Sequence, residues 1–207
     1  MTANTQSQGA PDGIVLVHAD AVEDQPWRNG GGKTRELLTW PAGSDWRLRI
    51  SRADIEVDGP FSPYAQVQRW FTVLQGAGVV LSFAERRCEL RPGTAPLCFD
   101  GATPPGCRLV DGPTQDLNLM LRGGSGVMRA VDPSVAWSEP LGMRGLYAAA
   151  AGTWCAAQQT LQLPAHTLLW QQHTDDAPWT FEPTLAGDTA QAWWLGFSPD
   201  LGRSPEQ

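Results

Sequence analysis

The segment from Pro26 to Glu36, PWRNGGGKTRE, concentrates residues that could do chemistry. Its core, GGGKT, ends like a phosphate-binding loop, in which a glycine-rich turn and the first amides of a helix hold phosphate oxygens. That motif needs a glycine five residues before Gly32, where this chain has Trp27. It also needs a helix after Thr34, yet only six residues separate Thr34 from Pro41, and they suit a strand better. The segment therefore does not predict a nucleotide site.

Two uses remain open for Asn29 and the glycines at positions 30–32. The glycines could serve only to turn the chain, which is the commonest role of Gly and Asn in loops. Their bare backbone amides could instead approach and bind a small anion. Arg35 and Glu36 follow directly, and a strand points neighbouring side chains to opposite faces. Only one of these two residues can therefore point into a pocket.

Composition and charge restrict the classes of protein to consider. A chain of 207 residues forms one large domain or two small ones, and 42% hydrophobic residues with 10 tryptophans exclude a disordered chain. The net charge of −7 argues against direct binding of nucleic acid or of an anionic membrane. Any anion that this protein binds must be small and locally recognised.

Cysteine spacing and hydropathy bear on the compartment. The four cysteines, at positions 88, 98, 107 and 155, form no CxxC pair, so a structural zinc site is not predicted. The first residues lack the pattern of a signal peptide, and no apolar run approaches the ~18 residues of a membrane span. We expect a cytoplasmic protein with reduced thiols and no membrane association.

The elements that must position these residues are strands. The chain has 22 glycines and 17 prolines spread from end to end, which leaves almost no span long enough for a helix. The segments Trp46–Val57 and Thr114–Gly124 alternate apolar and polar residues, and Gln68–Phe83 predicts a hairpin around the glycines at 76 and 78. Many short strands between Gly/Pro turns predict an all-β fold.

The second half of the sequence shows the same pattern of short predicted strands between turns. Residues 144–172 predict strands joined at positions 152–153 and 164–165, and residues 189–199 predict one more strand. The alanines at 148–151 are predicted to be strand rather than helix, because glycines bracket them closely. We expect an N-terminal lobe over residues 14–123, a C-terminal lobe over 124–202, and flexible tails at 1–13 and 203–207.

Four ordered motifs between Pro26 and Arg122 resemble those of the HutD/Ves family, bacterial proteins linked to histidine utilisation. They are PWRNGGGKTREL, DGPFSPY with Arg69 and GAG downstream, FDG at 99–101, and DGPTQDLNLMLR. The resemblance implies a bicupin, with two jelly-roll β-barrel lobes in one chain. The chain departs from the family pattern at residues 65–66, 117 and 123, which affects ligand detail rather than the fold.

Cupins commonly hold a metal through several histidines and a carboxylate. The three histidines of this chain, His18, His166 and His173, form no HxH pair, and none falls within the motifs. We therefore predict neither a metal nor another cofactor, although a site made only of Asp and Glu stays open.

Polar residues on alternating strands face either a pocket or solvent, and the residues alone leave both open. The family motifs favour a pocket. Arginines would bind carboxylates, asparagines would bind an amide or formyl group, and Glu36 and Asp116 would hold arginines in place. The predicted ligand-binding residues are Asn29, Arg35, Glu36, Arg49, Ser51, Arg69, Asp116, Asn118 and Arg122.

The resemblance implies that the protein binds a small acidic intermediate of histidine breakdown, such as formylglutamate, and moderates expression of that pathway without catalysis. The alternative is a metal-free hydrolase or isomerase of a small acid, with Glu36 or Asp116 as general base. A third consideration is Trp193-Trp194, which could form a homodimer interface or pack one lobe on the other.

Overall fold

The computed structural model describes residues 13–172, 177–187 and 191–200, and nearly all of their regular secondary structure is β-strand. The exception is η1 (Ala19–Ala21), a single 3-10 turn. None of the described residues belongs to a helix long and apolar enough to cross a membrane.

The first group of strands lies between residues 25 and 121. It consists of β2 (Gln25–Pro26), β3 (Gly32–Trp40), β4 (Leu48–Ile55), β5 (Gly59–Pro60), β6 (Gln68–Gln75), β7 (Val79–Ser82), β8 (Arg87–Leu90), β9 (Leu97–Asp100), β10 (Gly106–Leu109) and β11 (Thr114–Leu121).

The second group combines the first strand of the chain with those after residue 123. It consists of β1 (Ile14–His18), β12 (Gly124–Ala130), β13 (Met143–Ala148), β14 (Gly152–Ala156), β15 (Gln159–Leu163), β16 (Thr167–Gln171), β17 (Trp179–Pro183) and β18 (Ala192–Pro199).

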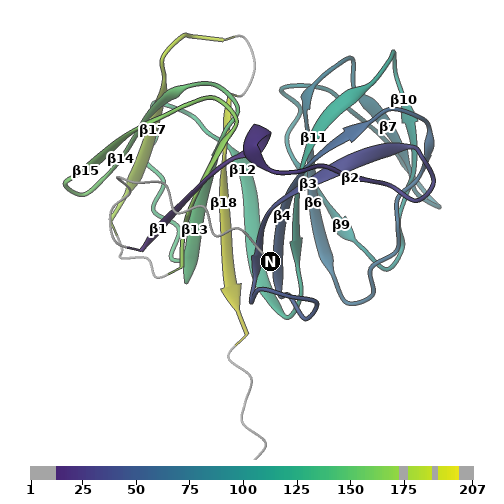
Figure 1. Ribbon diagram of the computed structural model, residues 1–207, viewed down its shortest axis with the longest axis horizontal. Helices are drawn as coiled ribbons and strands as arrows, with labels where there is room; N and C mark the ends of the chain where they lie inside the picture. The colour runs from purple at the N-terminus through teal and green to yellow at the C-terminus, as the bar shows by residue number, and fades with distance from the viewer. Residues whose placement is uncertain (1–12, 173–176, 188–190, 201–207) are drawn as a thin grey trace, which may run out of the picture.

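The strands form two pairs of sheets that lie side by side (Figure 1). The first sheet pair consists of a six-stranded sheet, β2-β3-β4-β11-β6-β9, and a four-stranded sheet, β5-β10-β7-β8. The second sheet pair consists of a five-stranded sheet, β1-β16-β13-β18-β12, and a three-stranded sheet, β15-β14-β17. All named strand pairs are antiparallel, so the prediction of an all-β fold is confirmed.

Two details of the predicted organisation are wrong. β1 pairs with β16 through all of its five residues, so residues 14–18 belong to the second sheet pair rather than to the N-terminal lobe. The predicted hairpin does not form either, because β6 pairs with β9 and β11 whereas β7 pairs with β8 and β10. Gly76 and Gly78, with φ of 97° and 107°, turn the chain from one sheet into the other.

β11 lies in the middle of the six-stranded sheet and sets the register of the site. Asn118 lies opposite Ser51 of β4 and Phe71 of β6, and Met120 lies opposite Arg49 and Arg69. Residues directly opposite one another in a sheet share a face. These side chains therefore share one face, as the alternation of residues 114–124 predicted, and in the structure this face lines the cavity of the first sheet pair.

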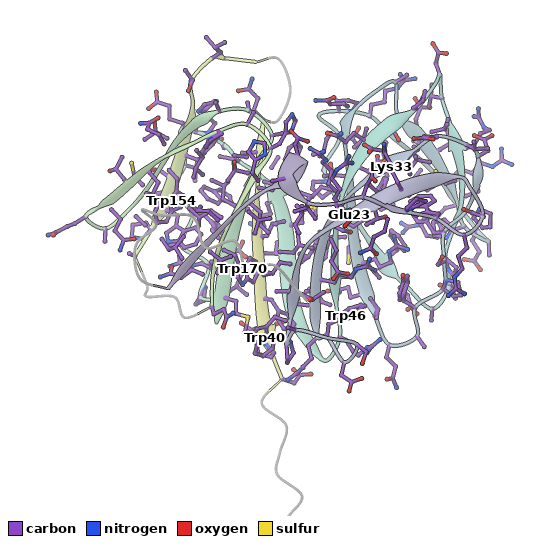
Figure 2. The ribbon with its side chains drawn as sticks, viewed as in Figure 1. Glu23, Lys33, Trp40, Trp46, Trp154 and Trp170 are labelled. Atoms are coloured by element: carbon purple, nitrogen blue, oxygen red, sulfur yellow. The ribbon has the colours of Figure 1, made fainter. Side chains whose placement is uncertain are left out.

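The other face of β11 packs against the second sheet pair. Its leucines, at 117, 119 and 121, are buried in one cluster with Trp170 and Trp193. Figure 2 shows Trp170 closer to the boundary between the sheet pairs, whereas Trp154 lies within the second pair. The apolar stripe of the strand is thus the contact between the two halves of the molecule.

The tryptophan pair at the end of the chain is buried. Trp193 is 1% exposed and belongs to the cluster between the sheet pairs, and Trp194 is 3% exposed inside the second pair. Trp193 therefore packs between the two sheet pairs, as the second alternative proposed, whereas Trp194 packs within the second pair.

A cationic cavity as the candidate functional site

A cavity of about 470 Å³ opens into the first sheet pair. This volume is in the range of small-molecule sites. Its walls come from the segment before β3, from the chain after β5, and from β3, β4, β6 and β11. The lining residues are Gln25, Pro26, Trp27, Arg28, Asn29, Thr34, Arg49, Ser51, Ala53, Ile55, Pro60, Phe61, Ser62, Tyr64, Arg69, Phe71, Asn118 and Met120.

Arg69 is a buried cation in the wall of this cavity, with 7% of its surface exposed. Its Nη2 donates a hydrogen bond to Oδ1 of Asn118 at 2.9 Å. Its guanidinium carbon lies 4.8, 5.9 and 5.4 Å from the ring centres of Phe61, Tyr64 and Phe99. No Asp or Glu among the described residues forms an ion pair with it. Within the described part of the chain, Arg69 is therefore a buried positive charge without a carboxylate partner.

The surroundings of Arg69 also affect its proton affinity. Burial lowers the pKa of the guanidinium to about 10, with the nearby Arg49 adding to the shift and Tyr64 opposing it. At neutral pH the group is still a cation. An anion that enters the cavity would provide a charge partner for Arg69 in place of the water that burial has removed.

Arg49 lines the same cavity but already has a partner. Its Nε lies 2.8 Å from Oε2 of Glu36, and its Nη1 donates to the hydroxyl of Tyr64 at 3.4 Å. Glu36 thus sits beside the cavity as the counterion of Arg49. The effective positive charge of this arginine toward a ligand is small.

Arg35 lies on the opposite face of β3. Its Nη1 donates to Oδ2 of Asp54 at 2.9 Å and its Nη2 to Oδ2 of Asp24 at 3.1 Å. Arg35 does not line the cavity, so no contact supports its predicted ligand-binding role. Leu37, two residues further along the strand, shares this face and is buried between the sheet pairs. A bulge in the pairing of β3 with β4 between residues 36 and 38 places Leu38 opposite Ile50, so that it packs against the same cluster.

The glycine loop shapes the rim of the cavity rather than donating amides to it. The N–H of Gly30 donates to the carbonyl of Trp27 at 3.0 Å, and that of Gly31 to Oδ1 of Asn29 at 3.0 Å. Both amides are therefore used within the loop. A side chain at Gly32 would meet the carbonyl of Asp54 at 2.2 Å, which explains a glycine there. Asn29 lines the cavity, as predicted.

Asp116 lies deeper on β11 and outside the lining of the cavity. It is fully buried, and its Oδ2 accepts a hydrogen bond from Thr114 at 2.9 Å. The predicted role of holding an arginine is therefore wrong. Burial raises the pKa of this carboxyl well above its usual range, a shift opposed by the Thr114 hydrogen bond and strengthened by Asp54.

Arg122 shares the face of Asn118 and Met120 but lies beyond the cavity lining. Its guanidinium carbon is 4.9 Å from the ring centre of Trp46, which belongs to a small cluster with Tyr64 and Met120. Arg122 thus supports the wall from outside. Of the nine predicted residues, five line the cavity: Asn29, Arg49, Ser51, Arg69 and Asn118.

Sequence reasoning missed Arg28, Trp27 and the aromatic residues around Arg69. Trp27 donates from Nε1 to Oγ1 of Thr34 at 2.7 Å and so fastens the loop to β3. Arg28 and Trp27 lie in the segment Pro26–Glu36, but a loop has no periodicity that predicts where a side chain points. The aromatic residues of DGPFSPY and FDG belong to the sequence motifs, but the sequence does not indicate that they contact Arg69.

The cavity does not fit a metal ion. Its lining contains three arginines and no His, Cys, Asp or Glu, and such a set repels a divalent cation instead of ligating it. Elsewhere in the described part of the chain, no three such ligand residues converge. His18 and His166 lie near Asp20, away from the cavity, and His173 lies outside the described residues.

Comparison with solved structures bears on the fold. A variant of oxalate decarboxylase from Bacillus subtilis shares the fold with a TM-score of 0.58 at 9% identity, over 89% of this chain and 77% of that one. The molecule is thus an all-β, cupin-like protein, and its cavity is cationic. The family model named HutD matches residues 19–191, and the chain belongs to the HutD family.

Relatives within the family are closer. An uncharacterized 21.2 kDa protein of the hutC 3′ region in Pseudomonas putida is 39% identical over 52% of this chain and 57% of its own length. Protein Ves of Cronobacter sakazakii is 36% identical over 46% and 54%. The chain thus spans about half the length of the curated relatives it matches. The structure of HutD from Pseudomonas fluorescens has a TM-score of 0.75 at 27% identity, covering 89% of this chain and 98% of that one.

Proposed function

We propose that the protein binds a small acidic metabolite of histidine degradation, such as formylglutamate, without a metal, and thereby governs histidine utilisation in the cytoplasm. Family membership supports the link to histidine utilisation. We further propose that each sheet pair is a jelly-roll barrel, so that the fold is a bicupin. The proposed ligand site is the cavity of the first pair.

The main support for this proposal is the environment of Arg69. A buried cation without a carboxylate partner is costly unless something compensates it, and a bound carboxylate would do so with charge-assisted hydrogen bonds. Because Arg69 only donates hydrogen bonds, it holds the oxygen of the Asn118 amide and leaves the Nδ2 donor for a ligand. The hydroxyl of Ser51 and the rings of Phe61 and Phe71 complete a site for a short acid.

The enzymatic alternative has no comparable support. Neither carboxylate proposed as general base lines the cavity. Glu36 is paired with Arg49, and Asp116 is buried below the cavity. A general base must reach the proton that it removes. Binding without turnover is therefore the better hypothesis.

Calorimetric titration with formylglutamate tests the proposal. We expect saturable binding by the wild-type protein and a loss of about 100-fold in affinity for Arg69→Met, because a buried charged anchor is removed. Arg87→Gln, an exposed residue of β8, is the matched control and should bind as the wild type does. Absence of binding to the wild type would contradict the proposed ligand class.

Two further measurements separate the functional roles. An NMR time course of formylglutamate with the protein should show no product, and turnover would favour the enzyme. In cells, Arg69→Met should alter expression from a histidine-induced promoter, because it removes the ligand response. Unaltered expression would contradict the governor role.

A further inference from the structure

The charges around the cavity do not balance. Three arginines line it, at positions 28, 49 and 69, and the lining contains no carboxylate. Glu36, beside the cavity, compensates Arg49. Two positive charges therefore remain, although the whole chain has a net charge of −7.

Neither of the other two predicted arginines can act as a second anchor. Arg35 lies on the far face of β3 between Asp24 and Asp54, and Arg122 rests on Trp46 beyond the lining. The second uncompensated charge is Arg28, which the sequence did not single out.

Arg28 is exposed at the rim, in a loop that is held at both ends. The N–H of Trp27 donates to the carbonyl of Gly32 at 2.9 Å, and the N–H of Gly30 donates to the carbonyl of Trp27 at 3.0 Å. The tight turn thus fixes the backbone of Arg28 beside the opening. Within the described part of the chain no carboxylate pairs with its side chain.

We propose that Arg28 is a second anion anchor and that the site selects dianionic acids, one carboxylate held inside by Arg69 and the other at the rim by Arg28. This inference rests on the proposed function of the same cavity. It explains how a strongly acidic protein can favour a doubly charged ligand, because the positive potential at the opening is local.

The two anchors contribute differently. Arg69 is desolvated, so its pairing with a carboxylate determines whether the acid binds at all. Arg28 is exposed, and ion pairs in water are weak and screened by salt. We therefore expect Arg28 to set the preference between a dianion and a monoanion, and to have little effect on a monoanion.

Glutarate and pentanoate are a suitable pair of probes. Both have five carbons, and a methyl group replaces one carboxylate in pentanoate. Glutarate is also symmetric, so either end can occupy the inner position. Their dissociation constants are measured by calorimetry or NMR titration for the wild type, Arg28→Gln, Arg28→Lys, Arg69→Met and the control Arg87→Gln.

We expect the wild type and Arg87→Gln to prefer glutarate by about fivefold at low salt, the upper range for an exposed ion pair. The preference should fall to about the statistical factor of two in Arg28→Gln, persist in part in Arg28→Lys, and shrink in ~0.5 M NaCl because Arg28 is solvated. Pentanoate affinity should be the same in the wild type and Arg28→Gln. Arg69→Met should lose both acids.

The outcomes distinguish the two proposals. If the wild type binds neither glutarate nor pentanoate nor formylglutamate, the proposed function fails. If both acids bind through Arg69 but Arg28→Gln keeps the glutarate preference, the proposed function stands and the role of Arg28 is overturned. A change in pentanoate affinity equal to that for glutarate in Arg28→Gln would also overturn it, since it would indicate damage to the loop.

Discussion

Arg69 and Asn118 form a buried hydrogen bond of 2.9 Å between two neighbouring strands of the six-stranded sheet. The cation meets the oxygen of a neutral amide at the position where a carboxylate would neutralise it. This pairing orients both groups without cancelling the charge. The cavity remains attractive to an anion for that reason.

The first prediction concerns that neutral partner. Asn118→Asp replaces an NH₂ group by an oxygen and places a carboxylate 2.9 Å from Nη2 of Arg69. We expect an internal ion pair that occupies the arginine and lowers affinity for formylglutamate by about 100-fold in calorimetry, with the fold retained. Asn29→Asp, at the rim, adds the same charge away from Arg69 and should cause a smaller loss. Equal losses in both variants would contradict the role of Asn118.

The second prediction is a conflict between binding and stability at Arg69. Burial without a charge partner disfavours the folded state, so Arg69→Met should raise the free energy of unfolding by about 1–2 kcal/mol while lowering the affinity for formylglutamate by about 100-fold. Urea denaturation of the ligand-free proteins measures this, and Arg87→Gln serves as the control. A decrease of more than about 1 kcal/mol would mean that Arg69 and its aromatic neighbours are chiefly structural.

The alternation of residues 114–124 predicted both faces of β11 correctly. It did not predict that Leu117, Leu119 and Leu121 pack between the two sheet pairs, because alternation says which side is apolar and not what covers it. It placed Asp116 with Asn118 on the polar face, but a period of two gives no depth along the strand. Asn118 lines the cavity, whereas Asp116 is buried below it.

The errors in predicting which strands pair with each other have a different cause. The glycines at 76 and 78 correctly signalled a turn, yet a turn does not say whether the strands on either side pair with each other. β1 pairs with a strand some 150 residues later, and no local pattern encodes such a distant partner. Arg28 was missed because side-chain directions in a loop follow its hydrogen bonds, which the sequence does not display.

The third prediction is a pH dependence of stability caused by Asp116. Below its ordinary pKa range the carboxyl is protonated in both folded and unfolded chains. Above that range the unfolded chain releases a proton that the folded chain keeps, because burial raises the folded pKa, and stability therefore falls as pH rises. Asp116→Asn keeps an acceptor for Thr114 and removes this effect.

Urea denaturation at pH 5 and pH 8 measures the third prediction. We expect Asp116→Asn to raise the free energy of unfolding by about 1–3 kcal/mol more at pH 8 than at pH 5. Asp111→Asn, at an exposed position, should show no such difference. The same gain at both pH values would mean that folding does not raise the pKa of the Asp116 carboxyl into or above this range.

The fourth prediction separates the two faces of β3. Arg35→Met removes the partner of Asp54 and one partner of Asp24, leaving them with Gln115 and Lys33. We expect the free energy of unfolding to fall by about 1–2 kcal/mol and the affinity for formylglutamate to stay unchanged, because Arg35 lies outside the cavity. Thermal denaturation and calorimetry on the same sample measure both quantities.

Glu36→Gln is the matched change on the opposite face, one residue along β3. It removes the counterion of Arg49 and leaves that arginine free to attract a ligand, so affinity for formylglutamate should rise by about two- to fivefold. The unfolding free energy should change little, because Glu36 is partly exposed. If Arg35→Met weakens binding and Glu36→Gln does not alter it, then the ligand approaches the other face of the strand and the cavity assigned here is not its site.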